Sequence, residues 1–300
     1  MKSILQTSQW ANFKKSTGWK IFENFGVFVH KRSLPFSKSF LYIPEIEFDH
    51  VEENLINWVK QLIQENNCIF TRIEIIDPEN EKITKQMFSS GFIRAFEQIQ
   101  PKWRQIIDIS PNEQKILSQM RQKGRYNVRL AERKGVKIAS GRSTDFVRTF
   151  YGLYAQTIDR ERIAGRDLKY FKNMVDKFSD TDYLDIYTAT YDREPVAAAV
   201  IGFHGGVASY LYGGSSRRHK EVMAPYLMHY QIIKDAKLRG CKTYDLIGRD
   251  QPGKSEKWAG VTKFKEQFGG EAVEIAGSFD LVNKKIAYNI FKIAERLRRR

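Results

Sequence analysis

The chain has 300 residues, and 50 lysines and arginines against 35 aspartates and glutamates give it a formal net charge of +15. With 42% hydrophobic and 13% aromatic residues, it is too apolar for a disordered basic tail and long enough to bury one or two cores. Its apolar runs, such as Val196–Phe203, are far shorter than the roughly 20 residues that cross a bilayer, which argues against a membrane-spanning protein.

The first hundred residues predict alternating strands and helices. The N-terminus has no apolar segment of the kind that forms a signal peptide, so we expect a cytoplasmic protein. Apolar residues at helical spacing after Asp49 indicate a long helix with that residue as its N-cap. The expected elements are strands over Lys20–Lys31 and Ser39–Ile43, a helix over Asp49–Asn66, a strand over Ile69–Ile76, a helix over Glu79–Ser90 and a strand from Phe92.

The middle of the chain is basic and mostly helical. Residues 102–172 hold 17 basic and 7 acidic side chains, and Pro111–Lys134 predicts helix with its apolar positions facing the body of the protein. Such a concentration favours a polyanionic partner, although a solvated basic face without a ligand is the alternative. Further elements are expected over Val136–Ala139 (strand), Thr144–Ile158 and Leu168–Phe178 (helices), and Tyr183–Tyr191 and Val196–Phe203 (strands).

The last hundred residues repeat the pattern of the first. A helix over Met223–Arg239 precedes a strand over Cys241–Ile247, as the helix over Asp49–Asn66 precedes Cys68 and its strand. A short helix around Thr262–Phe268, two glycines and a strand from Glu271 follow. We therefore expect two tandem copies of one α/β unit, with both cysteines serving as small buried apolar residues.

Several kinds of chemistry find no support in the sequence. The five histidines are scattered, and no pair of them has the spacing of a metal site on a helix. No phosphate-binding P-loop, dinucleotide fingerprint or nucleophile elbow is present. We therefore expect neither a metal nor a cofactor.

The order of elements in each copy resembles the GNAT acyltransferase fold. In that fold a glycine-bearing loop before the long helix holds the pyrophosphate of coenzyme A. The matching segment here, 217–224, has no glycine and places Glu221 where a pyrophosphate would be repelled. The sequence thus predicts an α/β (α+β) fold of two tandem GNAT-like domains, each a mixed sheet flanked by helices, with a donor other than acetyl-CoA.

Five motifs in chain order resemble those of the Fem family of peptidoglycan cross-bridge aminoacyltransferases (FemAB/FemX-like enzymes). They are QWANFK at 9–14, KGRYNVRLA at 123–131, YLYGGS at 210–215 followed by APY at 224–226, YDLIG at 244–248, and KFKEQFGG at 263–270. The resemblance implies transfer of an amino acid from aminoacyl-tRNA to an amine of a precursor stem peptide, with no DNA contact. It leaves open whether the precursor is lipid-linked or UDP-linked.

The resemblance also implies roles for individual residues. Lys14 and Arg166, helped by Tyr170, would hold the precursor's phosphates, and Tyr226 and Tyr212 would line the acceptor channel. Lys265, in a Phe-Lys pair with Phe264, would stabilise the oxyanion that forms when an amine attacks the ester. No general base is evident. The expected contacts with tRNA are Arg121, Lys123, Arg125, Arg129 and Arg133. Each of these residues also has an ordinary structural role as its alternative. Lys14 and Lys265 could be surface lysines, Arg166 a helix-capping residue, and the tyrosines part of the core.

The predicted domains are residues 1–105 and 106–300, with a C-terminal helix over 283–300 that either stays with the second domain or packs back on the first. Residues 284–300 hold 7 basic side chains and 1 acidic side chain. Their alternative partners are tRNA and anionic lipid, and the second alternative would place the protein at the inner face of the membrane. The alternative functions are a CoA-dependent N-acyltransferase and a non-catalytic module that binds RNA or a membrane surface.

Overall fold

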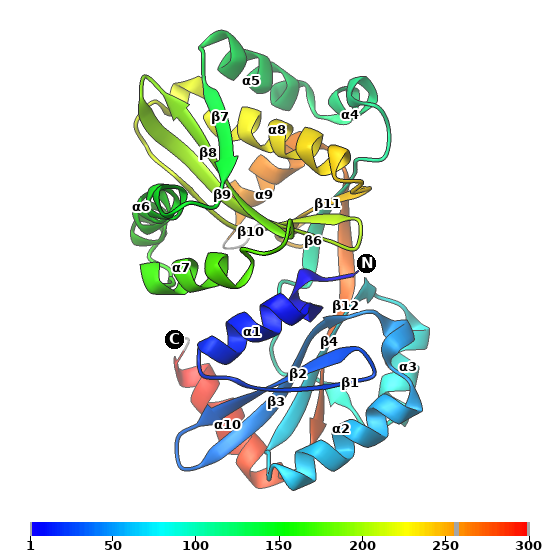
Figure 1. Ribbon diagram of the computed structural model, residues 1–300. Helices are drawn as coiled ribbons and strands as arrows, with labels where there is room; N and C mark the ends of the chain where they lie inside the picture. Colours follow the sequence, from blue (N-terminus) through cyan, green and yellow to red (C-terminus); the bar gives the residue numbers. More distant parts are fainter. Residues whose placement is uncertain (1, 255–257, 299–300) are drawn as a thin grey trace. The chain divides into compact units, whose positions relative to one another are not determined.

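A computed structural model of the chain describes residues 2–254 and 258–298, and two compact units make up the fold (Figure 1). The first unit comprises Met1–Lys102 and Glu274–Arg300, and the second comprises Trp103–Val273. The chain therefore returns to the first unit at Glu274, within a strand, whereas the predicted second domain ran on to residue 300. Residues 299 and 300 of the basic C-terminal segment lie outside the described residues.

The first unit is a mixed sheet with helices on both faces. Its strand order is β1-β2-β3-β4-β12, with β5 paired to β12, and only the β3–β4 pair is parallel. In chain order the elements are η1 (Ile4–Gln6), α1 (Ser8–Ser16), β1 (Lys20–Asn24), β2 (Val27–Leu34), β3 (Lys38–Ile46), η2 (Phe48–His50), α2 (Glu53–Glu65), β4 (Phe70–Pro78), α3 (Glu81–Ser89), β5 (Ile93–Arg94), β12 (Glu271–Val282) and α10 (Lys285–Arg298).

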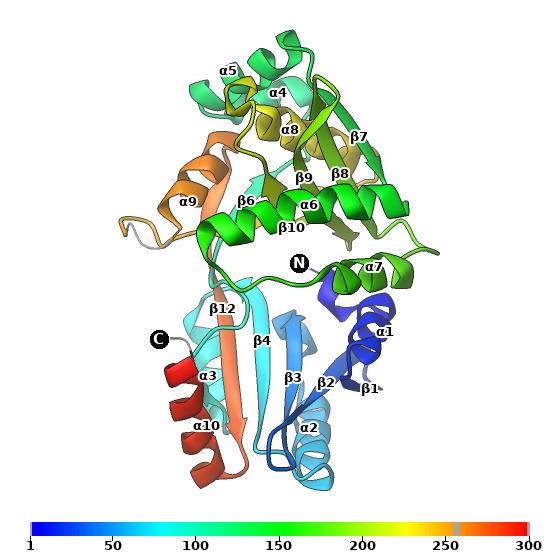
Figure 2. The ribbon, with the colours of Figure 1, turned by 90° about the vertical axis from the view of Figure 1, so that its left-hand side faces the viewer.

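Alternating residues of the first unit's strands feed two apolar clusters. In β3, Leu41 and Ile43 point to the cluster that α2 and α3 cover, while Phe40 and Tyr42 point to the one beneath α10. Tyr288 of α10 is 5% exposed there. Figure 2 shows α10 on the side of the sheet opposite α2 and α3. This burial explains why α10 belongs to the first unit.

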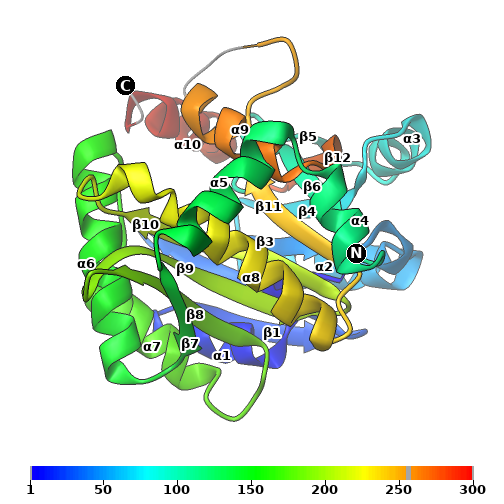
Figure 3. The same cartoon turned by 90° about the horizontal axis from the view of Figure 1, so that it is seen from above.

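The second unit has the same plan, with strand order β6-β11-β10-β9-β8-β7 and one parallel pair, β10–β11. Its elements are β6 (Trp103–Asp108), α4 (Glu113–Gln119), α5 (Gln122–Arg133), β7 (Lys137–Gly141), α6 (Thr144–Glu161), α7 (Leu168–Lys177), β8 (Leu184–Tyr191), β9 (Glu194–His204), β10 (Val207–Ser215), η3 (Lys220–Val222), α8 (Ala224–Leu238), β11 (Thr243–Gly248), α9 (Ala259–Lys265) and η4 (Glu266–Phe268). Helices α6 and α7 cover one face, and α8 covers the other with α5 beside it (Figure 3).

The repetition expected from the sequence is visible in the connections. Parallel neighbours need a crossover between them, and α2 joins β3 to β4 as α8 joins β10 to β11. Cys68 and Cys241 follow these two helices and are buried, with 0% and 6% exposure. The predicted mixed α/β class is confirmed.

Two predicted elements are divided in the structure. The strand expected over Lys20–Lys31 is a hairpin, because Phe25 and Gly26 both adopt positive φ values (53° and 68°) and reverse the chain. The helix expected over Pro111–Lys134 breaks after Gln119, where Met120 and Arg121 are extended. Among residues 2–254 and 258–298, no helix is long and apolar enough to cross a membrane.

Candidate active site

A cavity of about 350 Å³ lies in the second unit where two parallel strands separate. Strand β10 pairs with β11 only from Val207 to Ser209, although β10 continues to Ser215. In the first unit the corresponding β3–β4 ladder resumes after a register shift beyond Ile43 and pairs Ile46 with Ile75. The gap beyond Ser209 leaves room for a ligand between elements. The cavity is lined by Thr157, Arg160, Glu161, Ala197, Tyr210, Gly213, Gly214, Ser215, Pro225, Met228, His229, Gly260, Val261, Phe264 and Lys265.

Two glycines of β10 lie at points of close packing beside this cavity, Gly213 against a side chain and Gly214 against a backbone. The register with β9 shifts between Tyr210 and Tyr212, so the strand bulges there. A Cβ on Gly213 would lie 1.7 Å from the Tyr210 hydroxyl, and one on Gly214 would lie 2.4 Å from the backbone nitrogen of Tyr154 in α6. The glycines thus let α6 and the Tyr210 ring approach the wall of the cavity.

Lys265 places a buried amino group in the cavity wall. It ends α9, is 6% exposed, and donates a hydrogen bond from Nζ to the carbonyl oxygen of Gly248, at the end of β11. Nζ also lies over the Tyr210 ring, 5.8 Å from its centroid. Burial lowers the pKa of Lys265 to about 8, with Arg104 and Arg249 adding to the shift and Asp245 opposing it. At neutral pH the group is therefore a cation.

Hydrogen bonds from the segment after β11 hold α9 in position. The amide of Asp250 donates to Thr262 Oγ1 (2.9 Å), and Arg249 pairs with Glu266 (2.8 Å). Beneath them the buried Arg104–Asp245 ion pair, 2.6 Å long, joins β6 to β11. Because charged groups hold these segments together, Lys265 is carried on a rigid support.

His229 is a second polar group in the wall of the cavity. It is 0% exposed on α8, and its Nδ1 lies 2.6 Å from the hydroxyl oxygen of Tyr244 in β11. Its Nε2 has no hydrogen-bond partner among the described residues. Burial, reinforced by the charge of Lys265, lowers the pKa of His229 to about 3, so the imidazole is neutral at physiological pH.

Aromatic rings enclose these two polar groups. The His229 ring has Tyr210 edge-on at 4.7 Å, Phe264 at 5.4 Å and Phe268 at 5.1 Å between centroids. Tyr226 packs edge-on against Phe264 at 5.1 Å and lines an adjoining cavity of about 140 Å³. The structure thus brings Phe264, Lys265 and Tyr226, three of the predicted site residues, into one cluster.

Three other predicted residues form a separate cluster between α7 and β10. The hydroxyls of Tyr170 in α7 and Tyr212 in β10 are 3.0 Å apart. The Arg166 guanidinium lies over the Tyr170 ring, 5.1 Å from its centroid, and Arg166 is exposed. Tyr212 therefore lies with the predicted phosphate-binding residues, apart from Tyr226.

Lys14, the remaining predicted phosphate ligand, lies in the first unit near the end of α1. Its Nζ is 4.8 Å from the centroid of the Trp19 ring. Behind it, His30 is 0% exposed, and burial together with the charge of Lys14 lowers the pKa of His30 to about 3. His30 is thus neutral at physiological pH.

The five basic residues predicted to contact tRNA all lie in or next to α5, but they differ in availability. Lys123, Arg129 and Arg133 are exposed. Arg121 pairs with Glu266 at 3.0 Å, and Arg125 donates from Nη1 to the carbonyl oxygens of Ser118 and Met120. Arg125 thereby provides hydrogen-bond donors for carbonyl oxygens at the C-terminal end of α4. Its guanidinium thus has a structural role within the protein.

The loop before α8 has few free backbone amides to offer an anion. The amides of Val222, Met223 and Tyr226 donate to the carbonyl oxygens of His219, Lys220 and Met223. Pro225, in the first turn of α8, has no N–H group. A pyrophosphate placed at this helix N-terminus would therefore find little of the amide cradle that GNAT enzymes use.

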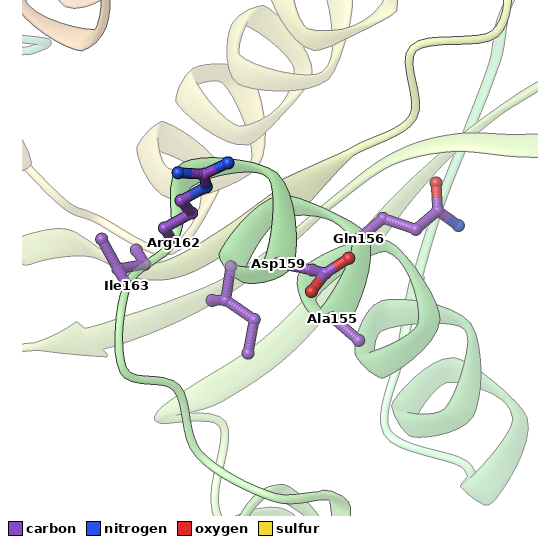
Figure 4. A pocket seen from close by; sticks show the side chains of 6 residues that line it. Ala155, Gln156, Asp159, Arg162 and Ile163 are labelled. Carbon is purple, nitrogen blue, oxygen red and sulfur yellow. The ribbon is translucent and has the colours of Figure 1, made fainter.

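A larger depression, about 640 Å³, lies at the C-terminal end of α6 (Figure 4). Asp159 and Arg162 are its charged groups, and all its lining residues come from the segment 155–163. Functional pockets gather polar groups from several elements, as the cavity beside Lys265 does. We therefore assign the candidate site to the smaller cavity. Within the described part of the chain, no group of three His, Cys, Asp or Glu side chains is placed to hold a metal ion.

His229 and Tyr210, which line the cavity beside Lys265, and Tyr244, which contacts His229, are not among the residues predicted from the sequence. Both tyrosines lie in the motifs YLYGGS and YDLIG, the first of them beside a residue that was selected. The only signal for His229 is its place in the helix after APY, because its pairing with Tyr244 is formed by packing α8 on β11.

Comparison with known proteins identifies relatives over nearly the full chain. The model of the FemAB family matches residues 58–194 and 184–296. A lipid II:glycine glycyltransferase from Staphylococcus epidermidis is 22% identical over 384 residues, which cover 98% of this chain and 91% of the relative. The enzyme of that name from Staphylococcus haemolyticus is 21% identical over 379 residues, covering 96% and 90%.

Solved structures share the fold. The crystal structure of FemX matches with a TM-score of 0.86 at 19% identity, covering 97% of this chain and 94% of the other. A tandem GNAT protein from the clavulanic acid biosynthesis pathway matches with a TM-score of 0.51 at 8% identity, covering 85% and 78%. The predicted fold of two tandem GNAT-like units is confirmed.

Proposed function

The chain belongs to the FemAB family, and on that premise we propose that it transfers an amino acid from aminoacyl-tRNA to an amine of a peptidoglycan precursor peptide. The observation that carries the proposal is the buried cation of Lys265 in a cavity between separated strands. The names of the relatives, lipid II:glycine glycyltransferases, favour a lipid-linked acceptor.

The proposed reaction joins an amine to an activated ester. The acceptor nitrogen attacks the ester carbonyl carbon, a C–N bond forms, and the carbonyl oxygen becomes an oxyanion. The Lys265 ammonium stabilises that oxyanion, a role for which one fixed donor is worth about 3 kcal/mol. Lys265 is buried among aromatic rings, and its low exposure to water strengthens this charge interaction.

His229 supplies the proton acceptor in this proposal. The proposal requires the tautomer in which Nδ1 donates its proton to the Tyr244 oxygen, because Nε2 then has a free lone pair for the proton of the attacking amine. The same proton passes to the ribose oxygen as the ester C–O bond breaks, so the imidazole is neutral before and after. The low pKa of His229 favours release of this proton to the leaving oxygen but makes the neutral imidazole a weak acceptor, so the proposed uptake has to accompany C–N bond formation, which makes the amine proton acidic.

The other predicted residues have proposed roles in binding, with Tyr212 moved from the acceptor channel to the cluster of Arg166 and Tyr170, and with Arg121 and Arg125 held by partners within the protein. Arg166, Tyr170 and Tyr212 form one cluster suited to an anionic or sugar part of the acceptor, and Lys14 offers a second cation for its phosphates. Lys123, Arg129 and Arg133 are the exposed cations of α5 for tRNA phosphates. Acetyl-CoA is the less favoured donor because of the satisfied amides and Pro225 before α8.

Mass spectrometry of muropeptides tests the proposal in cells. We expect the stem peptides of cells without the gene to lack an amino acid that cells with it carry, and the wild-type gene to restore it. A gene encoding Lys265→Met should fail to do so at equal protein abundance. Unchanged muropeptides after deletion would argue for the non-catalytic alternative, a module that binds RNA or a membrane surface.

A further inference from the structure

Helix α10 has two apolar faces, although one is enough to hold it on the first unit. On the inner face, the Phe291 ring lies 5.8 Å from that of Phe40 and 5.3 Å from that of Phe70, and Tyr288 is buried beside them. These contacts account for the amphipathic pattern that a surface helix needs. The apolar residues of the outer face have no such explanation.

The outer face carries a continuous stripe of large aliphatic side chains. Ile286, Ile290, Ile293 and Leu297 are 80%, 63%, 57% and 64% exposed. Their spacing of four, three and four residues places them on one side of the helix, about a quarter turn or more from the buried rings. Contiguous exposed apolar surface of this kind marks an interaction site.

Basic residues border this stripe. Lys285, Lys292 and Arg296 lie along one edge of it by helical position, and Arg298 lies toward the other. The helix has one acidic residue, Glu295, whose side chain is 17% exposed and is paired with Arg298 at 2.5 Å. The outer face therefore combines an aliphatic centre with positive edges.

We propose that the outer face of α10 (Ile286, Ile290, Ile293 and Leu297 with the flanking Lys285, Lys292 and Arg296) binds the surface of an anionic lipid bilayer. The helix lies parallel to the surface, with the aliphatic stripe among the acyl chains near the headgroups and the basic residues at the headgroup phosphates. This site is separate from the cavity beside Lys265 and holds whether or not the proposed transfer takes place.

Charge and area favour a bilayer over other occupants. A second copy of α10 would bring basic edges against basic edges, and one four-residue stripe is small against the roughly 1,200–2,000 Å² of a stable protein interface. RNA would satisfy the basic residues but would leave the isoleucines in water. Anionic lipid satisfies both the charge and the aliphatic stripe.

Co-sedimentation with vesicles tests the proposal with the full chain and no substrate. We expect binding to vesicles of equal parts phosphatidylglycerol and phosphatidylcholine, weaker binding at higher salt, and little binding to phosphatidylcholine alone. The double variant Ile290→Asp/Ile293→Asp should lose about tenfold or more of the affinity. The triple variant Lys285→Glu/Lys292→Glu/Arg296→Glu should lose the preference for phosphatidylglycerol.

Leu238→Asp is the matched control, because Leu238 is 88% exposed at the end of α8 in the second unit and should not affect binding. Circular dichroism of each variant checks that the fold is retained. Three results would overturn the proposal: no binding of the wild type to the anionic vesicles, equal binding by the double variant, or a dimer in solution that the double variant dissociates. Because no donor or acceptor is present, a failure here is distinct from a failure of transfer.

Discussion

Lys265 is positively charged at neutral pH although its burial favours the neutral amine. The ammonium has a carbonyl oxygen as its hydrogen-bond acceptor and Asp245 as the carboxylate that favours its charged form, while two arginines disfavour it. Removal from water costs such a group several kcal/mol unless it is compensated. A cation kept under these conditions is available to an oxyanion at little reorganisation cost, which is the physical basis of the proposed role.

The pKa of Lys265 provides a direct prediction. In protein labelled with ¹³C at lysine Cε, one resonance should titrate near pH 8, against about 10.4 for ordinary lysines, and it should be missing in Lys265→Met. Below that pH the group is charged, so its contribution to transfer is present at neutral pH and is lost as pH rises through about 8. A midpoint above 10 would contradict the burial argument.

His229 should matter for the rate of transfer more than for binding. We expect His229→Gln to lower kcat by about 10²–10⁴ with little change in KM, since a glutamine fits a hydrogen bond but does not relay a proton. Added imidazole should partly restore His229→Ala and should not restore Lys265→Met. All three variants are assayed for steady-state transfer at varied acceptor concentrations, which gives kcat and KM separately. Wild-type kcat in His229→Gln would remove His229 from the mechanism.

At the scale of elements, the separation of β10 from β11 creates the cavity, and the bulge in β10 sets its wall. Gly214 lies where β10 touches the backbone of α6, so an added methyl group has no flexible neighbour to displace. The contact between β10 and α6 therefore needs glycine at position 214. The reason is steric, since the φ angle of Gly214 is one that other residues also adopt.

Two glycine-to-alanine variants should shift the free energy of unfolding in opposite directions. Gly214→Ala overpacks the contact with α6 and should cost about 1–3 kcal/mol. Gly152→Ala, in the middle of α6 with nothing within 4 Å of the new Cβ, should stabilise the protein by about 0.4–1 kcal/mol. Urea unfolding followed by circular dichroism measures both. A neutral Gly214→Ala would show that β10 and α6 are not in close contact.

The basic face of α5 has its own prediction. Reversing the exposed cations in Lys123→Glu/Arg129→Glu/Arg133→Glu should weaken tRNA binding and reduce the slope of log K against log salt by roughly 0.7–0.9 for each phosphate that the protein no longer neutralises. The control is an equal reversal on exposed lysines of the first unit, Lys60→Glu/Lys82→Glu/Lys85→Glu. Filter binding across salt concentrations measures both, and equal weakening would mean that charge alone, without a defined surface, binds tRNA.

At the scale of the whole molecule, the two units share a fold and differ in what they offer chemically. Both have a parallel pair joined by a long helix, but only in the second does that pair separate beside a buried lysine. In our proposals the first contributes Lys14 as a phosphate ligand and the outer face of α10 as a lipid-binding surface. This division suits a duplicated acyltransferase unit in which one copy keeps the chemistry and the other serves binding.

Much of this organisation is predictable from the sequence because it depends on local periodicity. The helices before Cys68 and Cys241 show their apolar stripes directly, and the Phe264-Lys265 pair is part of a motif. Features that depend on packing are not predictable in this way. The His229–Tyr244 contact needs α8 laid on β11, and Arg125 looks like any other arginine of α5 until it is seen to satisfy the end of α4.

The sequence leaves packing of the C-terminal helix on the first domain as one alternative, but it does not predict that the chain already returns there within β12. From Glu274 on, β12 belongs to the first unit and pairs with β4. The alternation of apolar residues in β12 would suit either sheet, so the sequence does not predict this pairing. The exposed stripe on α10 was hidden for the same reason. Its isoleucines are core candidates by periodicity until Tyr288 and Phe291 are seen to take the inner face.

Transfer in a purified system tests the central claim most directly. The full chain is mixed with tRNA charged with a radiolabelled amino acid and with a lipid-linked precursor, and label on the precursor is measured over time. We predict transfer by the wild type, a loss of about 10²–10³ in rate for Lys265→Met, and no transfer when acetyl-CoA replaces the tRNA. Absence of transfer with every charged tRNA, or an unchanged rate in Lys265→Met, would contradict the account.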